Sequence, residues 1–130
     1  MRLKCAVLPD PLAICRLPQG ASIPIWALSG GYFSVTRTSA ELSVVCSQHL
    51  VPSELQSERD WRCLKVEGPL DFTLSGVLAS IAEPLARANV SIFSISTYDT
   101  DYVLVKESDL EKTISILSQA GHEVRFQEQG

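Results

Sequence analysis

Residues 90–105 read V-S-I-F-S-I-S-T-Y-D-T-D-Y-V-L-V. Two short runs rich in Ile, Phe, Val and Tyr stand on either side of the polar residues 97–101, and this pattern predicts a β-hairpin. Apolar residues recur at the i, i+3, i+4, i+7 spacing of an amphipathic helix both before and after the hairpin. They are Leu74, Val77, Leu78, Ile81 and Leu85 on the N-terminal side and Leu110, Ile114 and Leu117 on the C-terminal side.

A further strand is predicted beyond each helix. Residues 61–66 alternate as W-R-C-L-K-V, and residues 122–126 alternate as H-E-V-R-F. The order is therefore β-α-β-β-α-β. Since connections do not cross and βαβ units are right-handed, this order predicts an α+β, ferredoxin-like fold: an antiparallel four-stranded sheet with both helices on one face.

The N-terminal half reads as a reduced copy of this unit. Residues 12–17 predict a first strand, and residues 32–46 predict a second hairpin. Between them, residues 21–28 contain Pro24 and are too few for a full helix. We therefore expect two ferredoxin-like units, the first truncated: residues 1–60, ending in a polar linker at 51–60, and residues 61–130. At a shift of 60 positions, Phe33, Ser34, Val45 and Leu50 align with Phe93, Ser94, Val105 and Leu110.

Three local signals mark the ends and the interior of the helices. Pro84 removes the helical hydrogen bond to the carbonyl of Ser80, so a bend is expected there. Residues 108–111, S-D-L-E, fit a capping box with Ser108 as N-cap. Gly121 stands where a left-handed residue would end the second helix.

Composition limits the class of protein. The chain has 130 residues, 45% of them hydrophobic, and a net charge of −4. This charge argues against nucleic acid and anionic membrane as partners. Four widely spaced cysteines suit buried hydrophobic positions better than disulfides or a metal site. No apolar run is long enough for a membrane span, and the N-terminal one is too short for a signal peptide, so we expect a cytoplasmic protein.

With two hairpins read in this way, the chain resembles the ACT-domain family, and specifically the small tandem-ACT proteins related to the CASTOR arginine sensors. The resemblance spans most of residues 12–126. It is carried in the second half by residues 76–78 (G-V-L), 81–86 (I-A-E-P-L-A), 96–102 (S-T-Y-D-T-D-Y) and 104–105 (L-V), and in the first half by residues 23–24 (I-P), Trp26, 33–38 (F-S-V-T-R-T) and 41–46 (E-L-S-V-V-C). It implies a non-catalytic regulatory module that binds an amino acid where ACT units meet. It also implies that two copies of this two-unit chain associate, most simply as a homodimer.

A site for an amino acid can be placed on two segments. The start of the first full helix offers free backbone amides to a carboxylate. The hairpin turn offers a carboxylate and hydroxyl groups to an ammonium group. The candidate ligand-binding residues are Asp71, Phe72, Thr73, Leu74, Ser75 and Gly76 at the helix start, and Thr97, Tyr98 and Asp101 at the turn.

Each candidate also has an ordinary structural explanation. Asp101 could serve as a turn residue that bonds its own backbone. Thr73 and Ser75 could cap the helix, and Tyr98 could pack across the hairpin.

Other functions lack the residues they need. His49 and His122 have no nucleophile nearby in a recognisable setting, so no enzyme and no catalytic residue is expected. The aromatic and basic string of an RNA-recognition motif is absent from residues 102–106, and no C-x-x-C pair offers a metal site, so neither metal nor cofactor is expected. The alternative to an amino-acid sensor is a protein-interaction or oligomerisation module without a working ligand site.

Overall fold

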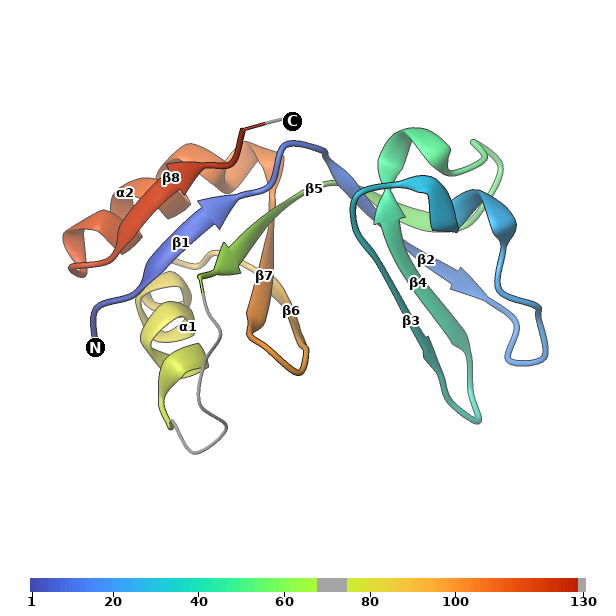
Figure 1. Ribbon diagram of the computed structural model, residues 1–130, viewed down its shortest axis with the longest axis horizontal. Helices are drawn as coiled ribbons and strands as arrows, with labels where there is room; N and C mark the ends of the chain where they lie inside the picture. The colour runs from blue at the N-terminus through green and yellow to red at the C-terminus, as the bar shows by residue number, and fades with distance from the viewer. Residues whose placement is uncertain (68–74, 129–130) are drawn as a thin grey trace. The chain divides into compact units, whose positions relative to one another are not determined.

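The computed structural model describes residues 1–67 and 75–128, and the chain divides into two compact units. The C-terminal unit consists of Met1–Pro9 together with Arg62–Gly130, and the N-terminal unit is Asp10–Trp61. Both units are built on antiparallel hairpins, as the sequence predicted. A long strand, β5 (Ser57–Val66), crosses from one unit to the other (Figure 1).

The sheet of the C-terminal unit has the ferredoxin-like order with one strand added. Its strands follow the order β6-β7-β5-β1-β8. Without β1 this is the predicted four-stranded arrangement. The elements are β1 (Lys4–Val7), α1 (Val77–Arg87), β6 (Ile92–Ser96), β7 (Asp101–Lys106), the 3₁₀ turn η3 (Glu107–Asp109), α2 (Leu110–Gln119) and β8 (Glu123–Phe126).

Strand β1 lies between β5 and β8. Cys5 is opposite Val66 in an antiparallel pair and opposite Val124 in a parallel pair, so β1 fills the position where β5 and β8 would otherwise meet. This strand was not predicted from the sequence, and residues 1–9 were expected to belong to the first unit. A four-residue run with hydrogen-bond partners about 60 and 120 residues away has no local signature.

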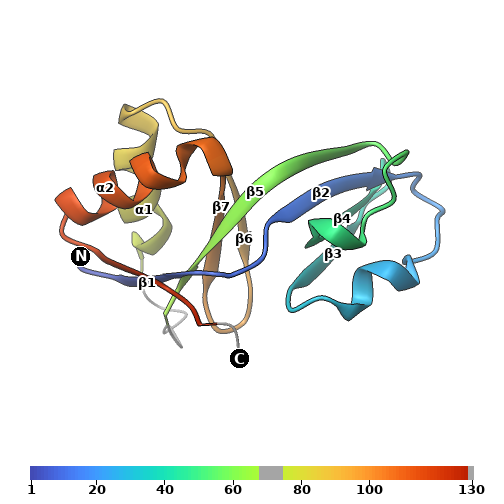
Figure 2. The same ribbon diagram turned by 90° about the horizontal axis from the view of Figure 1, so that it is seen from above.

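Both helices cover one face of this sheet, as expected (Figure 2). The i, i+4, i+8 residues of α1 are buried, and they are Val77, Ile81 and Leu85. From α2, Leu110 and Leu117 join them over the strand residues Cys5, Val7, Leu64, Val66, Val103 and Val105. Each large side chain buried in this way contributes about 1.5–3 kcal/mol to stability.

The N-terminal unit keeps the ferredoxin-like strand order but has lost its helices. The strands follow the order β3-β4-β2-β5. The elements are β2 (Leu12–Leu17), η1 (Ile25–Ser29), β3 (Phe33–Arg37), β4 (Leu42–Ser47) and η2 (Gln48–Leu50), where η1 and η2 are 3₁₀ turns. A small core formed by Ala13, Cys15, Ala27, Leu42, Val44, Cys46 and Val51 lies under these turns. The truncated unit that the sequence predicted is therefore present.

The polar linker predicted at residues 51–60 is partly wrong, since β5 begins at Ser57. Ser57 and Glu58 pair with β2, and the register then shifts at a bulge. At the bulge Asp60 has a φ of 67°, and the Gln48 amide both accepts from its backbone N–H and donates to its carboxylate. The first residues of β5 are polar, and side-chain hydrogen bonds hold them in place. A prediction based on the periodicity of apolar residues does not detect such a strand end.

The helix ends agree in part with the predictions. Gly121 has a φ of +96° after α2, which confirms the left-handed position. The predicted capping box is wrong: η3 extends the start of the helix, so Asp109 rather than Ser108 is the N-cap, and it makes no side-chain cap bond. Helix α1 continues through Pro84, and the freed carbonyl of Ser80 lies 3.0 Å from Nε2 of His122.

Candidate functional site

The turn between β6 and β7 carries three of the candidate ligand residues. Thr97 closes the turn: its backbone N–H donates to the Thr100 carbonyl over 2.8 Å, and its hydroxyl accepts from the Thr100 N–H over 3.3 Å. Asp101 lies opposite Ser96 in the hairpin and accepts a 2.5 Å hydrogen bond from the Ser96 hydroxyl. These contacts fix the position of the Asp101 carboxylate.

Thr100, which is not among the residues predicted from the sequence, connects this turn to β5. Its side chain is buried, and its hydroxyl donates a 2.6 Å hydrogen bond to the carbonyl of Val66. Val66 is the last residue of β5, so the turn is attached to the strand end that leads toward α1. A buried threonine in a turn resembles an exposed one in sequence, which is why pattern analysis missed it.

The start of α1 is open at its N-cap. Gly76 occupies this position with a φ of 81°, and as a glycine it brings no side chain to cap the helix. The Gly76 carbonyl accepts from the Ser80 N–H, which is the first intrahelical bond, so the amides before Ser80 have no helical acceptor. Such amides, together with the partial positive charge of the helix end, favour a carboxylate.

The structure describes five of the nine candidates. Ser75 and Gly76 are exposed at the start of α1, where Gly76 rather than Ser75 is the N-cap residue. Thr97 and Asp101 bond within the hairpin, while Tyr98 is 81% exposed at the turn. The remaining candidates Asp71, Phe72, Thr73 and Leu74 lie outside the described residues.

The other residues that could carry out chemistry occupy positions that give them a structural role. In the part of the chain that the structure describes, no group of three or more His, Cys, Asp or Glu side chains is placed to hold a metal ion. His122 is buried, with Nδ1 accepting from the Leu3 N–H. Burial raises the pKa of the Tyr102 phenol, so this side chain stays neutral beside the turn. None of the described helices is both long and apolar enough to cross a membrane.

Comparison with known families and structures agrees with this fold. The family model of the ACT domain matches residues 56–119, and a second model, of an N-terminal domain, matches residues 10–54. The crystal structure of Atu0741 from Agobacterium tumefaciens is 38% identical, has a TM-score of 0.94, and covers 99% of this chain and 96% of its own. Clostridium acetobutylicum aspartate kinase is 12% identical and shares the fold alone, with a TM-score of 0.66 over 89% of this chain and 34% of the kinase.

Curated relatives include proteins named as arginine sensors. The rat cytosolic arginine sensor for mTORC1 subunit 1 is 36% identical over 105 residues, which is 78% of this chain and 31% of the sensor. The human protein of the same name is 34% identical over the same shares of the two chains. The chain thus spans about a third of the length of these relatives.

Proposed function

The chain belongs to the ACT-domain family, and on this premise we propose that it is a non-catalytic regulatory protein that binds a free amino acid. The observation that carries the proposal is the similarity to proteins named as arginine sensors, which extends over the candidate turn and the start of α1. The described residues support it because they offer groups that suit both ends of an amino acid.

The α-carboxylate of the ligand binds at the start of α1. Backbone amides that precede the Ser80 N–H donate to it, and the exposed Gly76 leaves room for close approach, since a Cβ added there would meet no atom within 4 Å. The α-ammonium binds at the turn, where Asp101 supplies a carboxylate and Thr97 a hydroxyl group. Tyr98 and the segment containing Asp71, Phe72, Thr73 and Leu74 complete the site. In this proposal the ligand lies where ACT units meet.

We further propose that two copies of the chain associate. The relatives are about three times as long as this chain. A homodimer of this chain would therefore come closer to the number of ACT units in one relative. Because the relatives are named as cytosolic, we place this protein in the cytoplasm as well. Light scattering at micromolar concentration tests the dimer, and a mass equal to one chain would contradict it.

A thermal-shift experiment with each of the twenty amino acids tests the ligand. A ligand at 100 times its Kd stabilises the folded state by about 2.7 kcal/mol, which raises the Tm by several degrees. We expect one amino acid or a small related group to do so. If none shifts the Tm while the protein holds a stable protein partner, the interaction module is the correct alternative.

The Asp101→Asn variant tests the turn. It keeps an acceptor for the Ser96 hydroxyl but removes the charge that faces the ammonium group. A hydrogen bond to a charged group contributes about 1.5–3 kcal/mol, so the Kd measured by calorimetry should rise about 10- to 100-fold. Glu111→Gln, an equal charge change at an exposed position on α2, is the control and should leave the Kd unchanged. Equal effects of the two substitutions would exclude Asp101 from the site.

A further inference from the structure

We propose that Cys15 and Cys46 form a redox-active dithiol, a modification site at which hydrogen peroxide produces a disulfide within the N-terminal unit. All four cysteines of the chain are free thiols in the structure. This pair differs from the others in its geometry and in its surroundings, and it lies entirely inside Asp10–Trp61. The proposal is therefore independent of the ligand site.

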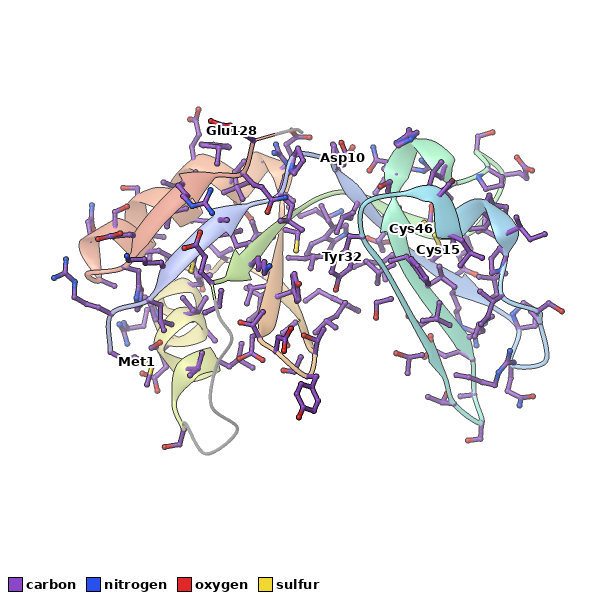
Figure 3. The ribbon with its side chains drawn as sticks, in the orientation of Figure 1. Met1, Asp10, Cys15, Tyr32, Cys46 and Glu128 are labelled. Carbon is purple, nitrogen blue, oxygen red and sulfur yellow. The ribbon has the colours of Figure 1, made fainter. Side chains whose placement is uncertain are left out.

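The strand register brings the two thiols together. In the antiparallel pair of β2 and β4, Cys15 is opposite Val44 and Ala13 is opposite Cys46. The cysteines are thus diagonal neighbours on one face of the sheet, an arrangement in which side chains can interact. Figure 3 shows the two residues next to each other on adjacent strands. The Cα atoms of diagonal neighbours lie about 7–8 Å apart, slightly beyond the usual disulfide range, so bringing the two sulfurs to about 2.05 Å requires a small movement of the strands.

The proximity of the two thiols activates one of them. Interaction with the Cys46 thiol lowers the pKa of Cys15, and the same interaction raises the pKa of Cys46. The nearby Arg59 guanidinium favours the thiolate further, although burial opposes it. Since the thiolate is the nucleophilic form, Cys15 is the residue that attacks the oxidant and Cys46 the one that resolves the product.

The reaction balances with one peroxide per pair. The Cys15 thiolate attacks one oxygen of hydrogen peroxide; the O–O bond breaks, the sulfur becomes a sulfenic acid, and the released hydroxide takes a proton to become water. The Cys46 sulfur then attacks the Cys15 sulfur. The S–O bond breaks, the Cys46 proton leaves with the hydroxide as a second water, and an S–S bond forms. Two thiols are oxidised by two electrons and the peroxide is reduced.

Access to the pair depends on the turn that covers it. Cys15 and Cys46 are 1% and 0% exposed. Their cover includes η1, a 3₁₀ turn of five residues whose only buried residue is Ala27 and which has no side-chain cap. So short an element opens locally at low cost. A small oxidant should therefore reach the thiols faster than a bulky aromatic disulfide reagent.

Cys5 and Cys63 supply an internal control in the C-terminal unit. In the pairing of β1 with β5, Cys5 is opposite Val66 on the face covered by the helices. Along β5, Cys63 is adjacent to Leu64, which lies on that same face, so the Cys63 side chain is on the other face. The two side chains therefore point to opposite faces of the sheet and cannot pair. Burial raises the pKa of Cys5 to about 11 and that of Cys63 to about 12, which keeps both as unreactive thiols.

The experiment is peptide mapping of the intact chain after treatment with hydrogen peroxide. Free thiols are alkylated in denaturant, and the digest is analysed by mass spectrometry without reduction. We expect the intact protein to lose two hydrogen atoms in mass, one cross-linked peptide pair to join Cys15 to Cys46, and Cys5 and Cys63 to be alkylated. The oxidised protein should also melt several degrees higher than the reduced one, because the cross-link restricts the unfolded chain.

Variants and reagents sharpen the test. Cys46→Ser should stop at a Cys15 sulfenic acid, which dimedone traps, and Cys63→Ala should leave cross-linking unchanged. The mapping of the unmodified chain does not depend on whether these variants fold. The proposal is overturned if native protein stays fully reduced, if cross-linking requires urea, or if the cysteines pair at random.

Discussion

Gly30 is a position where a single added carbon would collide with the sheet. A Cβ built there would lie 2.4 Å from Oγ of Ser47 and 3.3 Å from Cδ1 of Leu50. The Gly30 φ of −83° suits any residue, so the contact alone makes the substitution unfavourable. Overpacking of this kind costs about 1–3 kcal/mol. We expect Gly30→Ala to reduce the free energy of unfolding by that amount in urea titrations.

Gly31 is the matched control for this prediction. A Cβ added to Gly31 would meet no atom within 4 Å. Gly31→Ala should therefore be neutral or slightly stabilising through loss of unfolded-state entropy. If the two variants unfold at the same urea concentration, the close approach of Gly30 to Ser47 does not limit stability.

At the candidate site, the sequence predicted which residues are present at the turn, but it did not predict which residues they contact. Asp101 and Thr97 were chosen because a turn bearing a carboxylate and a hydroxyl suits an ammonium group, and both lie on the predicted hairpin. Their partners could not be predicted. The bond from Thr100 to Val66 joins residues 34 positions apart, and only tertiary structure brings them together.

At the scale of elements, helix α1 lacks one intrahelical hydrogen bond, and His122, the residue before β8, bonds to the carbonyl that is left free. Pro84 has no N–H, and the neutral His122 ring, with its proton on Nε2, donates to the freed Ser80 carbonyl while Nδ1 accepts from the Leu3 N–H. His122→Phe removes the side-chain partner of both part-buried backbone groups. Each such group costs about 1–3 kcal/mol, so we expect a loss of roughly 2–4 kcal/mol in the free energy of unfolding.

A double-mutant cycle separates this link from general packing. In a Pro84→Ala background the residue 84 N–H can bond to Ser80, so His122→Phe should cost about 1 kcal/mol less than in the wild-type chain. Glu83→Ala, at the adjacent exposed position, should show no coupling to His122. Additive effects of His122→Phe and Pro84→Ala would show that the imidazole does not replace the missing helical bond.

The elements that the sequence predicted are those with periodicity of their own. The helices around Ile81 and Leu117 and both hairpins follow from local spacing of apolar residues. Strand β1 and the first residues of β5 do not, because the former is four residues long and the latter is polar. Their positions depend on strand partners far away in the sequence, and no window of neighbouring residues reports those.

For the whole molecule, the different pKa shifts of the two pairs of thiols predict that the two units respond differently to alkaline pH. Cys5 and Cys63 both lie in the C-terminal unit, where burial raises their pKa values to about 11 and about 12 from an ordinary 9.0. Below pH 9 both thiols are protonated in the folded and the unfolded chain, and stability is unaffected. Above it the unfolded chain loses these protons first, so stability falls until the pH passes the folded values.

The size of the effect follows from the shifts. At about 1.4 kcal/mol for each unit of difference in pKa, the C-terminal unit should lose a few kcal/mol between pH 9 and pH 11. In the N-terminal unit the lowered pKa of Cys15 and the raised pKa of Cys46 oppose each other, so a smaller loss is expected there.

Two spectroscopic signals distinguish the units in one denaturant titration. Both tryptophans, Trp26 and Trp61, belong to the N-terminal unit, whereas α1 and α2 belong to the C-terminal unit. With a reductant at pH 10.5, the far-ultraviolet helical signal should disappear at a lower urea concentration than the tryptophan signal. The difference between the two urea midpoints should be smaller at pH 8. The double variant Cys5→Ala with Cys63→Ala should make this difference smaller at pH 10.5 as well. Transitions separated equally at both pH values would show that these thiols do not control the alkaline response.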